Sequence, residues 1–390
     1  MSTKKLLIVC NNLHIGGVQR ALVNLLWIIR ERYDVTLLLF YKGGALLKEL
    51  PPEIRVITAN SAYRYLGMHR KDTHGVKERL MRGVFAAITR FFGRKYAIAL
   101  MSLGQKALEG YDVAISYLHN SGNKMFYGGC NDFVLKHVLA RKKITFLHGD
   151  YLLCGADTPE NAKQYARFDS IAACSQGCAA SFLQAHPEMT EKVRVVPNCH
   201  RFEDIQAKAD AMPVEFSGDT INIVTVARFG KEKGVERALR AISRLGQLKE
   251  RLHFYLIGDG VQKPLLLQII QEEKLQGIVT MCGMLENPYG YIKAADLLLI
   301  PSYSEAAPLV IAEAACLGTP ILSTETSSAR EMIEQTGYGW VCENSETAMQ
   351  EALAVLLADA TVLHKRKKDL IQKGMDNKNA ISQFEQSIQL

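Results

Sequence analysis

Apolar, β-branched runs alternate with helical patterns along the whole chain. Alternation of this kind is typical of parallel sheets built from strand–helix–strand units. In the first half of the chain we expect strands at residues 6–10, 35–40, 54–58, 113–117, 144–147, 170–174 and 193–197. In the second half we expect strands at residues 221–227, 253–257, 278–282, 297–300, 320–323 and 339–342. The pattern therefore predicts an α/β protein with two doubly wound, Rossmann-like domains.

The length of the chain supports two domains, because 390 residues exceed what one hydrophobic core usually organises. We expect an N-terminal domain at residues 1–197 and a C-terminal domain at residues 198–363. Residues 197–212 are polar and poorly periodic, which indicates a hinge segment. Residues 364–390 are polar as well, and we expect a terminal helical segment that is either solvated or packed back on the N-terminal domain.

Composition places the protein among soluble globular proteins, with 48% apolar and 22% charged residues. The apolar run at residues 6–10 is too short for a secretory signal, and no other stretch approaches the length of a membrane span. The nine cysteines form no C-x-x-C pair. We therefore expect a cytoplasmic protein whose cysteines are ordinary thiols.

Charge is distributed unevenly along the chain. Residues 1–200 hold 27 Lys and Arg against 15 Asp and Glu, a balance of +12, and the rest holds 20 against 25, a balance of −5. A basic half suits an anionic partner such as a membrane surface, but a solvated basic face explains the same charge. No recognition motif accompanies the charge, so we do not expect nucleic-acid binding.

The most informative stretch is residues 301–320, PSYSEAAPLVIAEAACLGTP. It follows a predicted buried strand, so its first residues lie at the carboxyl edge of a sheet, where open α/β sheets bind ligands. Pro308 suits the first position of a helix, and Gly318 suits its end. Glu313 is then the one carboxylate on an otherwise apolar helix, and burying it without a partner would be costly. Ligand hydroxyls could satisfy it, and Glu305 lies in the preceding loop.

Two further loops follow predicted strands. Arg228 and Lys233 lie in VARFGKEKG, and the two cations could converge on a diphosphate. Gly16 and Gly17 lie between the first strand and an amphipathic helix, where they allow a ligand close to the backbone. Neither loop carries the G-x-G-x-x-G fingerprint, so a nicotinamide cofactor is not supported.

Together these segments resemble the retaining glycosyltransferases of the GT-B fold, in particular glycosyltransferase family 4, also called group 1. The resemblance spans nearly the whole chain, and its most specific element is the E-x7-E motif, here Glu305 and Glu313. Ala306 and Cys199 occupy places where the family usually has glycine. The fold that the resemblance implies is two Rossmann-like domains facing a cleft.

The resemblance also implies roles for individual residues. Glu313 would bind the ribose of a nucleotide sugar, and the base would lie near Met284. Glu305 and His148 would lie at the transferred sugar and are the candidate catalytic residues. The donor's sugar and phosphates would further contact Gly16, Gly17, Arg228, Lys233, Ala307, Pro308 and Leu309.

For the reaction, the resemblance implies transfer of a hexose-type sugar with retention at the anomeric carbon, most commonly from a UDP-sugar. The nucleotide sugar is a substrate, so no cofactor is expected. The sequence has no D-x-D motif, and Arg228, Lys233 and a helix dipole can replace a cation electrostatically. We therefore expect no metal.

Residues 76–95 bear on the acceptor. They predict a helix with Val76, Leu80, Val84 and Ile88 on one face. The same stretch carries basic and aromatic residues, Lys77, Arg79, Arg82, Arg90, Arg94, Lys95, Phe85, Phe91 and Phe92. Such a helix either lies on an anionic bilayer or packs its apolar face on its own domain. The first alternative favours a glycan or polyprenyl-linked saccharide acceptor, as in bacterial capsule or other surface polysaccharide assembly, and a peripheral position on the inner face of the cell membrane.

Two other functions stay open at this point. Ala306 and Cys199, at family glycine positions, are compatible with a catalytically silent GT-B partner of another glycosyltransferase. A nucleotide-sugar epimerase shares the fold, but beyond Glu305 and His148 the sequence offers no acid–base residues for one.

Overall fold

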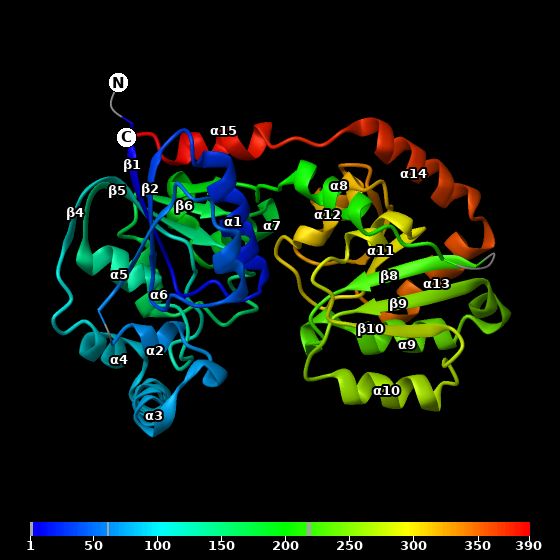
Figure 1. Ribbon diagram of the computed structural model, residues 1–390, viewed down its shortest axis with the longest axis horizontal. Coiled ribbons are helices and arrows are strands. Elements are labelled where there is room, and N and C mark those ends of the chain that lie inside the picture. Colours follow the sequence, from blue (N-terminus) through cyan, green and yellow to red (C-terminus); the bar gives the residue numbers. More distant parts are fainter. Residues whose placement is uncertain (1–2, 61, 217–219) are drawn as a thin grey trace. The chain divides into compact units, whose positions relative to one another are not determined.

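The computed structural model describes residues 3–60, 62–216 and 220–390. The chain forms two compact units, which we treat separately. Unit 1 comprises residues 1–199 and 377–390, and unit 2 comprises residues 200–376. Each unit is built around one sheet with helices on both faces (Figure 1). The predicted pair of Rossmann-like domains is therefore confirmed.

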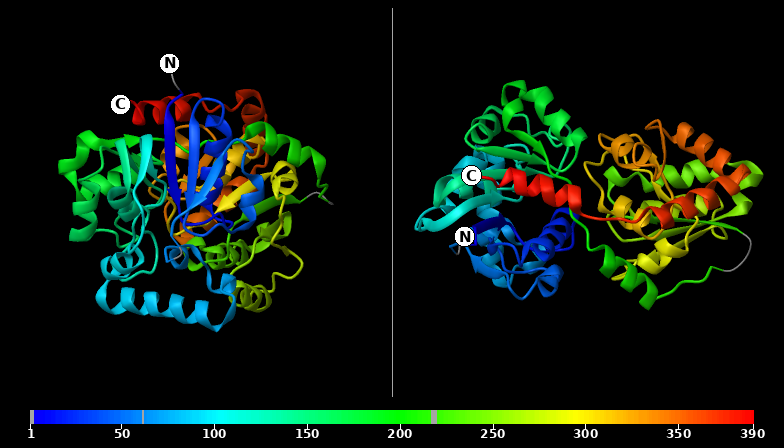
Figure 2. Two further views of the ribbon diagram at one scale, coloured as in Figure 1. Left: turned by 60° about the vertical axis from the view of Figure 1, so that its left-hand side comes forward. Right: turned by 90° about the horizontal axis from the view of Figure 1, so that it is seen from above.

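The sheet of unit 1 has seven strands in the order β3-β2-β1-β4-β5-β6-β7, and all neighbours are parallel. Its strands are β1 (Lys5–Cys10), β2 (Asp34–Leu39), β3 (Arg55–Thr58), β4 (Leu108–Ser116), β5 (Val138–Leu147), β6 (Ser170–Ala173) and β7 (Val193–Val195). Its helices are α1 (Gly17–Ile29), α2 (Arg64–Gly67), α3 (Gly75–Phe92), α4 (Arg94–Met101), α5 (Cys130–His137), α6 (Pro159–Tyr165), α7 (Gln176–Ala185) and α15 (Lys378–Ser387). Figure 2 gives two further views.

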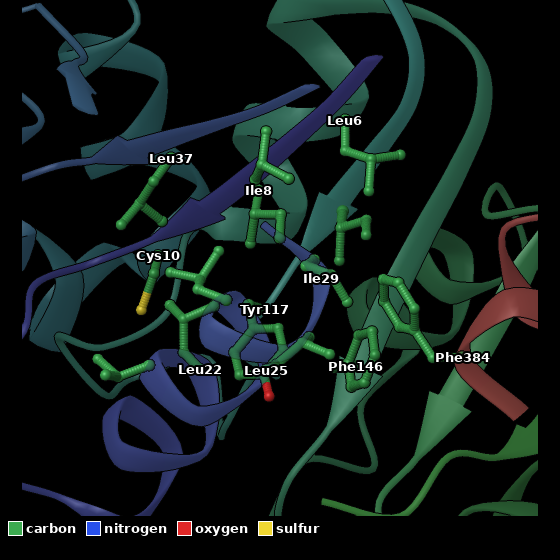
Figure 3. Close-up of a cluster of buried hydrophobic side chains, with 14 of the residues drawn as sticks. Leu6, Ile8, Cys10, Leu22, Leu25, Ile29, Leu37, Tyr117, Phe146 and Phe384 are labelled. Carbon is green, nitrogen blue, oxygen red and sulfur yellow. The ribbon is translucent and has the colours of Figure 1, made fainter. Parts of the chain in front are cut away.

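The central strand β1 is buried on both faces, as expected of a parallel sheet. Leu6, Ile8 and Cys10 join a cluster with α1, and Leu7 and Val9 face the opposite way, toward a cluster with α4 and α5. The first cluster receives Phe384 of α15 (Figure 3). The last helix of the chain thus completes the core of the unit that contains the first strand.

The sheet of unit 2 has six parallel strands in the order β10-β9-β8-β11-β12-β13. Its strands are β8 (Ile221–Val226), β9 (Leu252–Ile257), β10 (Val279–Gly283), β11 (Leu297–Ile300), β12 (Ile321–Thr324) and β13 (Gly339–Cys342). Its helices are α8 (Phe202–Ala211), α9 (Val235–Ser243), α10 (Lys263–Glu272), α11 (Tyr289–Ala294), α12 (Leu309–Cys316), α13 (Glu346–Ala358) and α14 (Thr361–Lys373). Helices α9, α10 and α13 pack on one face, and α8, α11 and α12 on the other.

The predicted hinge segment at residues 197–212 is wrong in most of its length, because residues 202–211 form helix α8 of unit 2. Ile205 and Ala209, one turn apart, are 3% and 1% exposed in the core of that unit. Two apolar positions in a polar stretch are too few for the sequence pattern to predict a helix. The observed change of unit lies at Cys199–His200, and the terminal segment is divided, with α14 in unit 2 and α15 in unit 1.

Candidate functional site

The carboxyl edge of the unit 2 sheet brings two of the predicted loops together. Strands β8 and β11 are neighbours, so the loops that follow them start side by side. The backbone N–H of Tyr303 donates to the carbonyl of Glu232 at 2.9 Å. The ammonium of Lys233 lies 2.6 Å from Oε1 of Glu305, and the hydroxyl of Ser302 donates to the same oxygen at 2.8 Å. Lys233 and Glu305, 72 residues apart in sequence, thus form one charged pair.

Arg237, which the sequence analysis did not single out, holds the loop that carries Glu305. Its guanidinium is buried, and it donates to the carbonyls of Pro301 and Ser302 at 2.7 and 2.5 Å. It also donates to Thr324 at 3.0 Å and lies 4.0 Å from the ring centre of Tyr303. Burial lowers the pKa of Arg237, which nevertheless remains the donor for this loop. The signal in the sequence is an arginine between buried positions of an amphipathic helix.

Two glycines allow the loops to approach so closely. Gly234 has φ +59°, and a Cβ there would lie 2.1 Å from the carbonyl oxygen of Pro301. Gly258 has φ +142°, and a Cβ there would lie 1.8 Å from the carbonyl oxygen of Ala227. Any side chain would collide with backbone at both positions. The turn at residues 258–260 therefore supports the loop of Arg228.

Helix α12 begins at Leu309, with Pro308 as its N-cap, one residue later than the sequence suggests. Glu313 lies in its second turn and is partly buried, and the hydroxyl of Tyr289 lies 3.4 Å from its Oε1. Because the first N–H groups of a helix have no partner inside it, the start of α12 can bind an anion. Ala306 does not need a glycine conformation here, since Lys274 alone among the described non-glycine residues has a positive φ.

Arg228 and Met284 are the exposed members of the predicted donor set. The side chain of Arg228 is 72% exposed and forms an ion pair with Glu232 at 2.5 Å. Met284 is 67% exposed and directly follows β10. Both side chains are therefore accessible to a ligand at this edge of the sheet.

The predicted residues of unit 1 lie at the carboxyl ends of β1 and β5. Gly16 is the N-cap of α1 and Gly17 its first residue, and a Cβ on Gly17 would meet no atom within 4 Å. His148 follows β5 and packs against Tyr117 and Phe146, with ring centres 4.6 and 5.6 Å away. Burial, with a smaller contribution from His119, lowers the pKa of His148 to about 3. The imidazole is therefore neutral near pH 7.

One group of side chains could bind a metal ion in the described part of the chain. The ligand atoms of His14, His69 and Asp72, all in unit 1, lie within 4.8 Å of one another. Nε2 of His14 is 2.8 Å from Oδ2 of Asp72, a hydrogen-bonding contact that these two side chains make without metal. The group includes none of the predicted donor-binding residues, so the expectation of a metal-free reaction stays a prediction.

Residues 208–376 match the sequence model of the family Glycosyl transferases group 1. The match covers nearly all of unit 2 and includes Arg228, Lys233, Glu305 and Glu313. Unit 2 is thus similar to members of this family, the group 1 glycosyltransferases that the sequence resembles.

The curated relatives include bacterial glycosyltransferases. WcaL of Salmonella typhimurium, assigned to colanic acid biosynthesis, is 27% identical over 57% of this chain and 56% of its own length. The Campylobacter jejuni N-acetylgalactosamine-N,N'-diacetylbacillosaminyl-diphospho-undecaprenol 4-alpha-N-acetylgalactosaminyltransferase is 28% identical over 50% of this chain and 52% of its own length. The chain therefore spans about half the length of the curated relatives it matches.

Solved structures agree with the fold over the whole chain. HepE of Anabaena, solved with UDP and glucose, aligns with a TM-score of 0.65 at 17% identity and covers 98% of both chains. WaaG, a glycosyltransferase involved in lipopolysaccharide biosynthesis, aligns with a TM-score of 0.59 at 15% identity and covers 98% of both chains. At this identity the likeness establishes the shared two-domain fold.

Proposed function

We propose that the protein is a retaining glycosyltransferase that moves a hexose-type sugar from a UDP-sugar to a glycan or polyprenyl-linked saccharide in bacterial surface polysaccharide assembly. The observation that carries the proposal is the charged pair of Lys233 and Glu305 beside the start of α12. A cation, a carboxylate and a helix N-terminus at the ligand-binding edge of a parallel sheet suit the phosphates and hydroxyls of a nucleotide sugar.

In this proposal the leaving diphosphate is stabilised electrostatically. Lys233 donates to Glu305, whose carboxylate also accepts from the Ser302 hydroxyl, so the ammonium is already oriented when the donor arrives. Preoriented charge costs no reorganisation when negative charge develops on the leaving group. Arg228, exposed on the same loop as Lys233, would add a second cation once it leaves Glu232. These groups supply the charge that a metal ion would otherwise supply, so we propose a metal-independent reaction.

In the same proposal Glu313 binds the ribose of the nucleotide, and Met284 lies near its base. Glu313 is partly buried on an apolar helix, and ribose hydroxyls would donate to its carboxylate. UDP is favoured as the nucleotide because HepE was solved with UDP-glucose, and WcaL and the Campylobacter enzyme favour a bacterial glycan as the acceptor. His148 and Glu305 would lie at the transferred sugar.

Helix α3 favours a membrane-bound acceptor. Of its residues only Phe85 and Thr89 are buried, and Val76, Leu80 and Val84 are 82%, 64% and 41% exposed. These three form one stripe, flanked by the exposed cations Lys77 and Arg79. Such a surface suits an anionic bilayer. No helix among the described residues is long and apolar enough to cross a membrane, and we propose a peripheral position on the inner face of the cell membrane.

The test is nucleotide release from a panel of UDP-, GDP- and ADP-sugars by the full chain, with and without EDTA. The proposal predicts release from a UDP-sugar that EDTA does not stop. Release that depends on a divalent ion would contradict metal independence. Absence of turnover, together with binding to another glycosyltransferase, would favour the silent-partner alternative.

A further inference from the structure

Two segments of unit 1 bring two histidines and an aspartate together. His14 lies in the loop between β1 and α1, and His69 and Asp72 lie in a short turn between α2 and α3. Their ligand atoms, one imidazole nitrogen from each histidine and one carboxylate oxygen, lie within 4.8 Å of one another. In a tetrahedral zinc site with bonds of about 2.0–2.2 Å, neighbouring ligand atoms are about 3.3–3.6 Å apart. Small side-chain movements therefore separate this group from a metal-binding arrangement.

The fold ties the two segments to each other without an ion. The backbone N–H of His14 donates to Oδ1 of Asn12 at 3.1 Å, and Nδ2 of Asn12 donates to the carbonyl of Gly67 at 2.6 Å. Asn12 is buried, so this link is shielded from water. A Cβ at Gly67 would lie 2.4 Å from the carbonyl oxygen of Asn11, so any side chain there would collide with backbone. The loop that carries His14 is thus fixed beside the segment that leads to His69.

The carboxylate of Asp72 is oriented by contacts with both histidines. Its Oδ2 lies 2.8 Å from Nε2 of His14 and accepts the backbone N–H of His69 at 2.8 Å. A carboxylate offers about four lone pairs, so these contacts leave capacity for an ion. Hydrogen bonds to a ligating carboxylate hold it in place and are common in protein metal sites. Asp72 is therefore suited to be the anchored ligand of the group.

The ring of His69 is the part that has to move. It stacks on the ring of His14, with centres 4.0 Å apart and an angle of 20° between the planes. A metal ion lies in the plane of each imidazole that binds it, so two nearly parallel rings share one ion only after one of them turns. His14 is partly buried and also stacks on Tyr41, with ring centres 6.3 Å apart, whereas His69 is exposed and can change rotamer. Rotation of one surface side chain therefore completes the site.

The chemistry of the three ligands selects a class of ion. Two imidazoles and one carboxylate suit Zn²⁺ and similar divalent transition ions, whereas Mg²⁺ and Ca²⁺ prefer oxygen ligands. Imidazole binds metal in its neutral form, which is the usual form near pH 7. The cations Lys71 and Arg82 lie close enough to act on His69 electrostatically. Their repulsion disfavours an ion held by charge alone, so coordination by the two nitrogens must supply most of the attraction.

We propose that His14, His69 and Asp72 form a binding site for Zn²⁺ or a similar divalent transition ion, with water in the fourth position. The ion would clip the loop that precedes α1 to the turn that precedes α3. The site includes none of the proposed donor residues, and its ion has no part in the proposed transfer. This inference therefore goes beyond the proposed function and does not depend on it.

The test measures binding of Zn²⁺ to the full chain by isothermal titration calorimetry, after dialysis against EDTA and in the absence of any nucleotide sugar. We expect one equivalent of Zn²⁺ to bind, and Mg²⁺ in large excess to leave this binding unchanged. His69→Gln and Asp72→Asn each remove one ligand and should raise the Zn²⁺ Kd at least about 10-fold, since even the loss of an outer-shell partner costs that much. His364→Gln, at an exposed position of α14, is the matched control and should keep the wild-type Kd.

Two further measurements separate this site from adventitious binding. Zn²⁺ should raise the Tm of the wild type and of His364→Gln but not that of His69→Gln, because only a ligand of the folded chain stabilises it. Co²⁺ bound in place of Zn²⁺ should show no thiolate-to-metal absorption band, since the protein ligands are nitrogen and oxygen. No bound Zn²⁺, a Kd that His69→Gln and Asp72→Asn leave unchanged, or a thiolate band would overturn the site. Nucleotide release tests the proposed function separately, so each of these failures concerns the metal site alone.

Discussion

At the scale of single residues, two polar side chains of the interior differ in how far their hydrogen bonds are satisfied. His148 packs against Tyr117 and Phe146, and its buried Nε2 has no hydrogen-bond partner in the described part of the chain. Arg237 is buried and donates to the backbone carbonyls of Pro301 and Ser302. It also donates to the side-chain oxygens of Thr324 and Asn344. The His148 ring is therefore neutral and resists protonation, whereas the positive charge of Arg237 is stabilised by neutral oxygen acceptors.

The low pKa of His148 predicts a pH dependence of stability. An unfolded histidine has a pKa of about 6.5, so the unfolded chain takes up a proton below that pH while folded His148 does not until about pH 3. The free energy of unfolding should therefore fall as pH falls from about 6.5 toward 3. In His148→Gln the loss between about pH 7.5 and pH 5 should be smaller by about 2 kcal/mol, measured by urea denaturation. An unchanged pH dependence would contradict the burial of this group.

The contacts of Arg237 predict a loss of stability when it is shortened. Arg237→Ala removes the side-chain donor of the buried Pro301 carbonyl and one of the two side-chain donors of the buried Ser302 carbonyl, the other being the Thr324 hydroxyl. We expect the free energy of unfolding to fall by about 2–4 kcal/mol, measured by urea denaturation. Arg240→Ala, at an exposed position of the same helix, is the matched control and should change it by less than about 0.5 kcal/mol. Equal effects of the two variants would refute the role of Arg237.

The sequence predicts some residues of the candidate site but not those that support it. Glu313 can be found from the sequence because a carboxylate breaks an apolar helical pattern, whatever its neighbours are. Arg237 cannot, because its role comes from the backbone carbonyls of Pro301 and Ser302, which only the fold brings near its guanidinium.

At the scale of helices and strands, the alternation of apolar runs predicts all of the observed strands and most of their bounds. Every predicted strand is present, from β1 to β13. The largest differences are β4 and β5, which begin at Leu108 and Val138, several residues before the predicted starts. Their first residues include Glu109, Gly110 and Arg141, which lie outside the core, so apolar patterning cannot reveal them.

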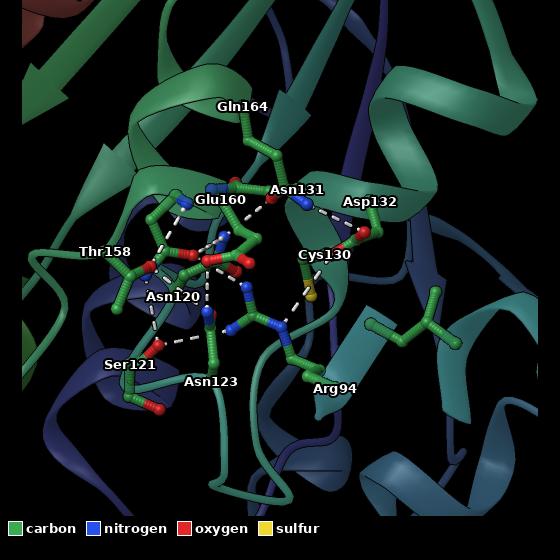
Figure 4. A network of polar contacts seen from close by, with 12 residues as sticks. Arg94, Asn120, Ser121, Asn123, Cys130, Asn131, Asp132, Thr158, Glu160 and Gln164 are labelled. Atoms are coloured by element: carbon green, nitrogen blue, oxygen red, sulfur yellow. Dashed lines mark hydrogen bonds and ion pairs between the residues drawn. The ribbon is translucent and has the colours of Figure 1, made fainter. Parts of the chain in front are cut away.

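For helix α3 the sequence pattern does not decide between two positions of the apolar face. An apolar stripe predicts a buried face as readily as a membrane-facing one. In the structure the face that packs on the unit is formed by Phe85 and Thr89, whereas Val76, Leu80 and Val84 stay exposed. Arg94, expected to contribute surface charge, is instead 3% exposed in a buried polar network, where it donates to the carbonyl of Ser121 (Figure 4). The predicted apolar stripe of α3 is present, but the pattern alone does not say whether the stripe is buried, because burial depends on what packs against the helix.

The exposed stripe of α3 predicts binding to anionic vesicles. The full chain should co-sediment with phosphatidylglycerol vesicles and bind less in about 1 M salt. The double variant Val76→Glu, Leu80→Glu should weaken binding at least about 10-fold, because it removes apolar contacts and adds repulsion. Val261→Glu, at an 85% exposed position of unit 2, is the control. Equal binding of the control and the double variant would exclude α3 as the membrane surface.

At the scale of the whole molecule, the two units differ in charge and in the ligands they suit. The first 200 residues carry a balance of +12 and the rest −5. Unit 1 holds the basic helix α3, and unit 2 holds the charged pair of Lys233 and Glu305. This division is compatible with the proposed contacts of unit 2 to a nucleotide sugar. The family match to residues 208–376 lies in unit 2.

The most direct test of this account is nucleotide release from a UDP-sugar panel by the full chain and four variants. Lys233→Ala and Glu313→Gln should each lower the rate at least about 10-fold, which corresponds to about 1.4 kcal/mol of lost interaction. Lys365→Ala and Glu351→Gln, at exposed positions of α14 and α13, are the matched controls and should keep the wild-type rate. No release from any nucleotide sugar, or equal rates in all five proteins, would contradict a donor site at this edge of unit 2.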